Sequence, residues 1–207
     1  MAGERRPEIR RKPKVIKMES IIVSKKEAAE RQLNTCIELF FREEDSVSVH
    51  TLASAVHDIL EVLTRDIRWF DIMLTASCIK PEKKKEVADI FKKAQNFFKH
   101  ASRDASVTME FAPFQTEVMI FDCVRMYMCL TGQKTAEVHV YNLWFIMRYP
   151  EYFDYIRDAN DPLFKLFATA EGVGVDPKHL QPFADVIPLL KKSGAFPLAI
   201  PGQPHPL

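Results

Sequence analysis

The sequence predicts an all-α protein: a single helical bundle around one buried helix, with extended tails at both ends. The 207 residues include only six glycines, and aliphatic and aromatic residues recur at helical spacing. The stretch at about 114–131 is apolar on nearly every side, and after Glu117 its only charged residues are Asp122 and Arg125. At this length it is too short to cross a membrane, so it belongs inside a bundle. Asp122 and Arg125 are expected to pair at the helix boundary.

The first helix is predicted to begin after Ser24 and to end near Glu44. Ser24 and Glu27 have the spacing of a capping box, in which each side chain binds a free backbone amide of the first turn. Residues spaced three and four apart form an inward apolar stripe. These residues are Ala29, Leu33, Cys36, Ile37 and Phe40.

The second helix is predicted over residues 48–68, after a break at Asp45 and Ser46 that caps it. Its expected buried face consists of Val49, Leu52, Ala53, Val56, Ile59, Leu60 and Leu63. His50 and His57 fall two turns apart on one side, which is too far for one metal ion without other ligands. We therefore expect both histidines at the boundary of the buried face.

The third helix is predicted over residues 81–101, with Pro81 in the first turn, where proline is preorganised. Its lysines are expected in solvent, and Val87, Phe91, Ala94, Phe98 and Ala101 on the buried side. The buried helix at 114–131 follows after a loop and is closed by Gly132.

The remaining helices are marked by their caps. Thr135 is predicted to open a helix that Pro150 ends. Shorter helices are predicted at 152–157, 162–170 and 177–192. Asp161 and Asp176 each precede a proline, as N-cap residues do.

The tails divide the chain into a basic disordered arm at 1–17, a helical domain at 18–193 and a proline-rich extended tail at 194–207. The arm has seven lysines and arginines against two glutamates, an excess of about five positive charges. Such an arm either binds phosphate groups or an acidic partner, or remains solvated. Its candidate nucleic-acid-binding residues are Arg5, Arg6, Arg10, Arg11, Lys12 and Lys14.

Several classes of function are disfavoured by the sequence. Cys36, Cys78, Cys123 and Cys129 show no C-x-x-C spacing, so reduced, buried thiols are expected. Neither a signal peptide nor a membrane-spanning run is present, which favours a cytoplasmic protein without membrane contact. We find no P-loop, dinucleotide-binding or hydrolase motif and no Glu-x-x-His motif, so no metal or cofactor is predicted.

The strongest candidate for chemistry is the end of the third helix, AQNFFKHASRD. Asn96 and His100 are four residues apart and share a helix face, and Lys99 and Arg103 lie beside them. A histidine next to cations suits proton transfer on a phosphodiester, because the cations stabilise developing negative charge. A polar helix end beside a capped loop has the same composition, so both interpretations stand.

These residues also carry a resemblance. The first two helices resemble the opening helical pair of HEPN domains, and the third has N-x-x-x-H where that family has R-N-x-x-x-H. The resemblance implies a metal-independent ribonuclease that pairs the motif arginine and histidine across a dimer. Carried over, Asn96 and His100 match, whereas Gln95 stands at the arginine position. SVHTLA and NFFKHASRD also resemble a group of uncharacterised bacterial all-helical proteins.

The sequence thus predicts a homodimeric HEPN-like protein of a bacterial defence or toxin-type system, which binds RNA or acts as a degenerate ribonuclease. Lys99 or Arg103 would have to supply the missing cation. The alternative is a non-enzymatic helical adaptor that contacts a protein partner through the arm or the proline-rich tail.

Overall fold

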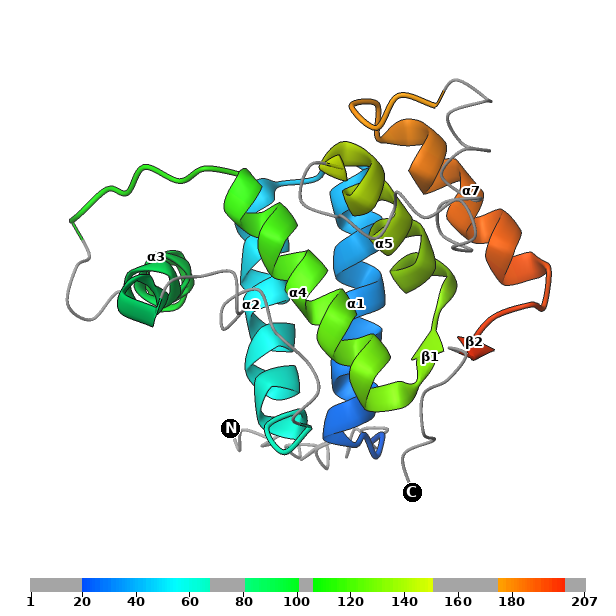
Figure 1. Cartoon of the computed structure of the whole chain (residues 1–207), viewed down its shortest axis with the longest axis horizontal. Coiled ribbons are helices and arrows are strands. Elements are labelled where there is room, and N and C mark those ends of the chain that lie inside the picture. The colour runs from blue at the N-terminus through cyan, green and yellow to red at the C-terminus, as the bar shows by residue number, and fades with distance from the viewer. Residues whose placement is uncertain (1–19, 68–80, 101–105, 151–174, 200–207) are drawn as a thin grey trace, which may run out of the picture.

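The chain folds as an all-α helical bundle, as the sequence predicts (Figure 1). The computed structural model describes residues 20–67, 81–100, 106–150 and 175–199. Its helices are α1 (Lys25–Phe41), α2 (Ser46–Leu63), α3 (Pro81–Lys99), α4 (Phe114–Thr131), α5 (Ala136–Arg148) and α7 (Gln181–Lys192). Two short strands, β1 (Gln133–Lys134) and β2 (Leu198–Ala199), pair antiparallel, with Gln133 opposite Ala199.

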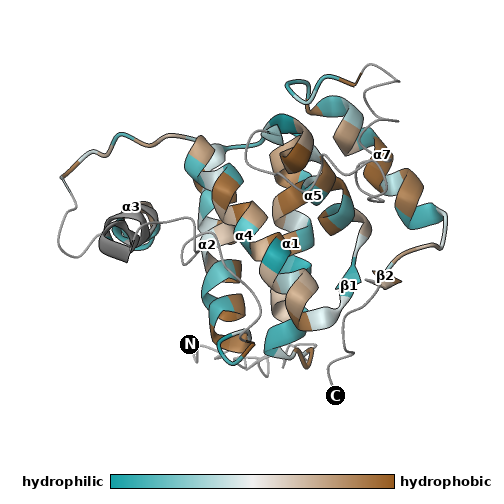
Figure 2. Ribbon diagram, in the orientation of Figure 1, coloured by the Kyte–Doolittle hydropathy of each residue, from teal (hydrophilic) through white to brown (hydrophobic). Residues whose placement is uncertain are grey.

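Helix α4 is the buried centre of the bundle, as predicted from its sequence. It packs against α1, α2 and α5, and most of its residues are buried, including both Asp122 and Cys123. Phe121 stacks on Phe145 of α5, with ring centroids 4.1 Å apart. Figure 2 shows that α4 and α5 are mainly hydrophobic, whereas α1 and α2 are mixed, as expected for helices with one solvated face.

Helix α1 begins as predicted but ends earlier. The capping box is present, because the Glu27 amide donates to Ser24 Oγ at 3.2 Å and the Ser24 amide donates to Glu27 Oε2 at 2.8 Å. The predicted end near Glu44 is wrong by three residues, since Glu43 has a left-handed φ of 55°. Phe41 rather than Phe40 is the fully buried aromatic residue of the last turn.

Helix α2 starts at Ser46, where the Ser48 amide donates to Asp45 Oδ2 at 2.8 Å, and it ends at Leu63, before the predicted end at 68. The expectation that His50 and His57 lie at the boundary is wrong, because both are buried. Both gain a partner on α4, Thr116 for His50 Nδ1 and Asp122 for His57 Nε2, whereas His50 Nε2 has no hydrogen-bond partner among the described residues.

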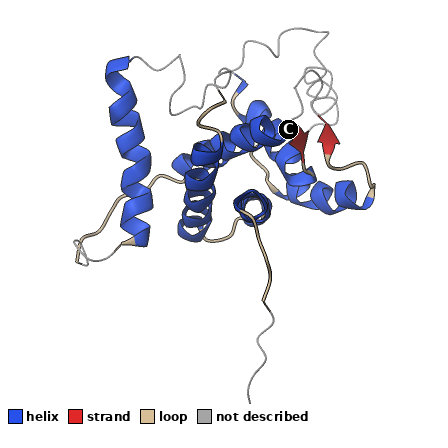
Figure 3. Cartoon of the chain, turned by 90° about the horizontal axis from the view of Figure 1, so that it is seen from below, coloured by secondary structure: helices blue, strands red, loops and turns tan. Residues whose placement is uncertain are grey.

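Helix α3 ends at Lys99 instead of 101 and stands beside the rest of the bundle (Figure 3). Its main neighbour among the described elements is α2. The contact is aromatic: Phe98 lies edge-on to His50 at 5.7 Å and to Phe111 at 5.1 Å. One face of α3 thus holds it to the bundle, and the opposite face remains open to solvent.

The C-terminal half is partly described. Thr135 caps α5 as predicted, with its Oγ1 accepting from the Val138 amide at 3.2 Å. The predicted start of the last helix at residue 177 is wrong: Asp176 accepts from the Lys178 amide in a turn, and α7 begins at Gln181. The predicted helices at 152–157 and 162–170 lie outside the described residues.

The ends of the described chain are extended. Ile21 and Ile22 precede α1 with side chains 78% and 100% exposed, so this apolar segment does not pack on the bundle. After α7 the chain runs through Phe196 and Pro197 into β2. Within the described ranges, no helix combines the length and apolarity that crossing a membrane requires.

Candidate functional site

The end of α3 carries three of the four predicted catalytic residues. Asn96, Lys99 and His100 are exposed there, and the His100 amide donates to the Asn96 carbonyl at 3.0 Å, which continues the helical pattern. Arg103 lies outside the described residues, as do the candidate nucleic-acid-binding residues of the arm. The structure therefore brings Asn96, Lys99 and His100 to one accessible helix end.

The motif position occupied by Gln95 is bonded to α2. Gln95 Nε2 donates to Asp58 Oδ2 at 2.6 Å, and Lys99 Nζ lies 3.3 Å from the same oxygen. Lys99, one of the two residues that could supply the missing cation, and Gln95, at the arginine position, thus both contact a carboxylate. Because the Asp58 side chain is half exposed, this contact adds little stability. It does place a negative charge beside Gln95 and Lys99.

The outer face of α3 is a cationic surface. At 100° per residue, Lys85, Lys92, Lys93, Lys99 and His100 fall within about 120° of one another, and Asn96 lies in the middle. The side chains of Lys85, Lys92, Lys93, Asn96 and His100 are exposed, whereas that of Lys99, which contacts Asp58 of α2, is 25% exposed. Asp89 is the only acidic side chain described on this face. We call this surface the lysine face of α3; from Lys85 to His100 it extends about 22 Å.

Two buried histidines lie between α2 and α4. His50 Nδ1 and Thr116 Oγ1 are 3.1 Å apart, and His57 Nε2 is 3.2 Å from Oδ2 of the buried Asp122. Burial, with a smaller effect of Lys99, lowers the pKa of His50 to about 4, so His50 is neutral at pH 7. These interactions occur inside the bundle, so we assign the histidines to packing rather than to catalysis.

One group of possible metal ligands lies on α2, next to the contact between Asp58 and α3. His57, Asp58 and Glu61 place one ligand atom each within 4.8 Å of one another. Asp58, however, is already bound by Gln95 and Lys99, and both carboxylates are exposed. This arrangement is an ordinary charged surface and gives no reason to assign a metal.

The described cysteines are buried thiols. Cys36 Sγ lies 3.5 Å from the Val49 carbonyl and Cys123 Sγ lies 3.6 Å from the Ala53 carbonyl, so both are donors between helices. Burial raises the pKa of Cys36 to about 12, which keeps it protonated and unreactive. Cys129 is also free and buried, and Cys78 lies outside the described residues.

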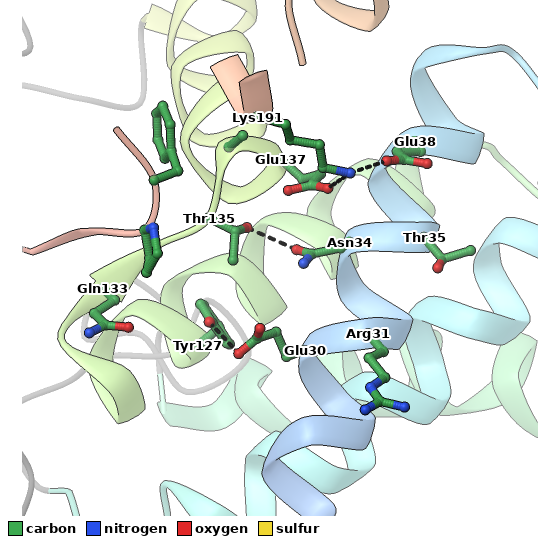
Figure 4. A pocket seen from close by; sticks show the side chains of 13 residues that line it. Glu30, Arg31, Asn34, Thr35, Glu38, Tyr127, Gln133, Thr135, Glu137 and Lys191 are labelled. Carbon is green, nitrogen blue, oxygen red and sulfur yellow. Dashed lines mark hydrogen bonds and ion pairs between the residues drawn. The ribbon is translucent and has the colours of Figure 1, made fainter. Parts of the chain in front are cut away.

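A cleft that the sequence did not reveal lies between α1, the start of α5 and the end of α7 (Figure 4). It has a volume of about 550 Å³, which is within the range of small-molecule sites. We call it the α1 cleft. Its polar walls come from α1, the start of α5 and the end of α7, and Phe196 and Pro197 close one side. The main polar residues are Glu30, Asn34, Glu38, Thr135, Glu137 and Lys191.

Helix α1 supplies three of these residues at four-residue spacing, and each contacts a different part of the chain. Tyr127 Oη donates to Glu30 Oε2 at 2.8 Å, and Thr135 Oγ1 donates to Asn34 Oδ1 at 2.8 Å. Lys191 Nζ donates to Glu38 Oε1 at 2.6 Å. In the sequence, these residues form a polar row beside the apolar stripe of α1, and this row was the only local signal of a cleft. Their partners lie far away in the chain, so the sequence did not show what the row contacts.

The most buried charge in the α1 cleft is Glu137, which is 2% exposed and forms an ion pair with Lys191. Burial opposes the charged form of Lys191, yet Glu137 and Glu38 outweigh it and raise its pKa. One ammonium group therefore bridges two carboxylates of different helices.

Comparison with protein-family models, curated proteins and solved structures finds no match to this chain.

Proposed function

We propose that this chain is a HEPN-like protein that binds single-stranded RNA through the lysine face of α3 and does not cleave it. The main supporting observation is that three exposed lysines, Lys85, Lys92 and Lys93, share with Asn96 and His100 one helix face that the described part of the bundle leaves open. Lys99 lies at the edge of this face, beside Asp58. Lysine ammonium groups at this spacing fit a phosphate backbone, because binding releases counterions without requiring a particular base sequence.

The state of Gln95 supports binding without cleavage. The resemblance places an arginine at this position, where it would stabilise charge on the phosphate. Gln95 is uncharged, and its amide is bonded to Asp58. Lys99 is drawn to the same carboxylate, so it does not replace the guanidinium. The end of α3 therefore retains contacts for RNA but lacks the cation for catalysis.

The test is the affinity of the full chain for a fluorescein-labelled oligouridine, measured by anisotropy over a series of salt concentrations. Lys92→Glu/Lys93→Glu should weaken binding on the order of tenfold at low salt and flatten the salt dependence. The matched control is Lys25→Glu/Lys26→Glu, because these adjacent lysines are exposed at the start of α1. Equal effects of the two double variants, or no binding by the wild type, would contradict the proposal and favour the helical adaptor.

The basic arm is proposed to add to this binding. Deleting residues 1–17 should weaken RNA binding most at low salt and leave the melting temperature nearly unchanged. A homodimer is expected only if the ribonuclease arrangement is retained, and light scattering measures this separately.

A further inference from the structure

We propose that the α1 cleft binds a linear aliphatic polyamine. The proposal is independent of RNA binding, because the cleft is lined by residues of α1, α5 and α7, and α5 and α7 lie on the side of the bundle away from α3 (Figure 1).

The charge of the α1 cleft favours a cation. Its walls include three carboxylates, Glu30, Glu38 and Glu137, against the two cations Arg31 and Lys191. Lys191 serves two of the carboxylates, and Arg31 is exposed. Glu30 accepts a hydrogen bond from the Tyr127 hydroxyl. Because this hydroxyl is neutral, the contact does not cancel the negative charge of Glu30. Partly buried carboxylates in excess attract a ligand that brings ammonium groups.

The length of the α1 cleft favours a ligand with more than one ammonium group. Glu30 and Glu38 are eight residues apart on α1, which is about 12 Å along the helix axis. Asn34 lies between them, and a neutral amide there tolerates a methylene chain or an internal amine. A linear triamine has charges near both ends and an apolar stem, so it can serve both carboxylates at once, whereas a single ammonium group cannot.

The protein already contains a group of this kind in the cleft. The Lys191 ammonium, on a flexible methylene stem from the last turn of α7, lies between Glu38 and Glu137 (Figure 4). It marks an ammonium position made of carboxylates from two helices. Because the Lys191 side chain is 48% exposed, it has room to move aside while the ligand occupies this position. Phe196, which is partly exposed at one side of the cleft, supplies apolar surface for the methylene groups.

The experiment is isothermal titration of the full chain with spermidine, compared with the short dicarboxylate glutarate as an anionic control. We expect one spermidine per chain and no binding of glutarate. Glu30→Gln and Glu38→Gln should each weaken spermidine binding about tenfold, because each removes one charge-assisted contact. Both substitutions keep the shape of the side chain, and circular dichroism checks that the variants are folded.

Glu44→Gln is the matched control, since Glu44 is exposed just after α1 and does not line the cleft. It should leave the affinity unchanged. Three results would overturn the proposal: no binding of spermidine, equal weakening by Glu44→Gln, which indicates diffuse attraction, or tighter binding of glutarate, which indicates an anion site around Arg31 and Lys191.

Discussion

Gln95 and Asp58 are joined by a hydrogen bond of 2.6 Å that links α3 to α2. In the proposed HEPN-like arrangement an arginine would stand at the position of Gln95, yet the Asp58 carboxylate contacts this side chain. An arginine introduced there would meet Asp58 before it met a phosphate. An arginine at position 95 can therefore reach a phosphate only if Asp58 is also replaced.

The first prediction concerns cleavage. In EDTA, the wild type and Gln95→Arg should leave single-stranded RNA intact, because Asp58 pairs with the new guanidinium. Gln95→Arg/Asp58→Asn should release the guanidinium and produce slow cleavage that His100→Ala removes. Gel electrophoresis of labelled RNA measures this. Cleavage by the wild type that depends on His100 would show an active ribonuclease and contradict binding alone.

The second prediction concerns the attachment of α3. Phe98→Ala should lower the free energy of unfolding by about 3 kcal/mol, at the lower end for phenylalanine truncation, since Phe98 is only half-buried between His50 and Phe111. Phe114→Ala, at a ring that is 47% exposed, should cost less than half as much. Urea denaturation compares the two variants, and equal losses would mean that the aromatic contact does not hold α3.

The third prediction is a pH dependence of stability. Burial lowers the pKa of His50 to about 4 from a reference value of 6.5, so the unfolded chain binds a proton that the folded chain does not. The neutral His50 therefore causes no loss of stability above pH 6.5. Between pH 6.5 and 4, it lowers the free energy of unfolding by roughly 1.4 kcal/mol for each pH unit. His50→Leu should flatten this slope, as measured by urea denaturation at a series of pH values. Burial also lowers the pKa of His139 to about 4, so part of the slope should remain.

The fourth prediction concerns the buried charge of Glu137. Lys191→Met should destabilise the protein by about 2 kcal/mol, because it leaves a buried carboxylate without its cation, while the half-exposed position of Lys191 lets water relieve part of the cost. Lys192→Met is the control, since Lys192 is the exposed neighbour in the same turn. Thermal denaturation should separate the two. Similar melting temperatures would mean that Glu137 is satisfied in another way.

The features predicted correctly from the sequence are local. The capping box of Ser24, the cap at Thr135 and the all-round apolarity of α4 each depend on residues a few positions apart. Errors in helix ends arose where backbone conformation decided the outcome, as at Glu43, or where a turn competed with a helix start, as at Asp176. The all-α class follows from such local signals.

The features missed depend on contacts between distant segments. Spacing placed His50 and His57 on one side of α2, but their burial was decided by Thr116 and Asp122, more than sixty residues away. The α1 cleft is a similar case, because Glu30 pairs with a residue 97 positions away. The Gln95 contact with Asp58 spans 37 positions. No helical periodicity encodes such pairs, so the electrostatic setting of Asn96, Lys99 and His100 was not predictable.

The attachment of α3 mainly to α2 has a consequence for how the molecule opens. A helix whose main contact among the described elements is with one other helix can detach as a unit while the remaining core stays intact, and each such opening exposes its backbone amides to exchange with deuterated solvent. Amides of α4, enclosed by α1, α2 and α5, exchange only when the whole molecule unfolds. The backbone amides of α3 should therefore exchange faster than those of α4. The surface proposed to bind RNA lies on the faster-exchanging helix.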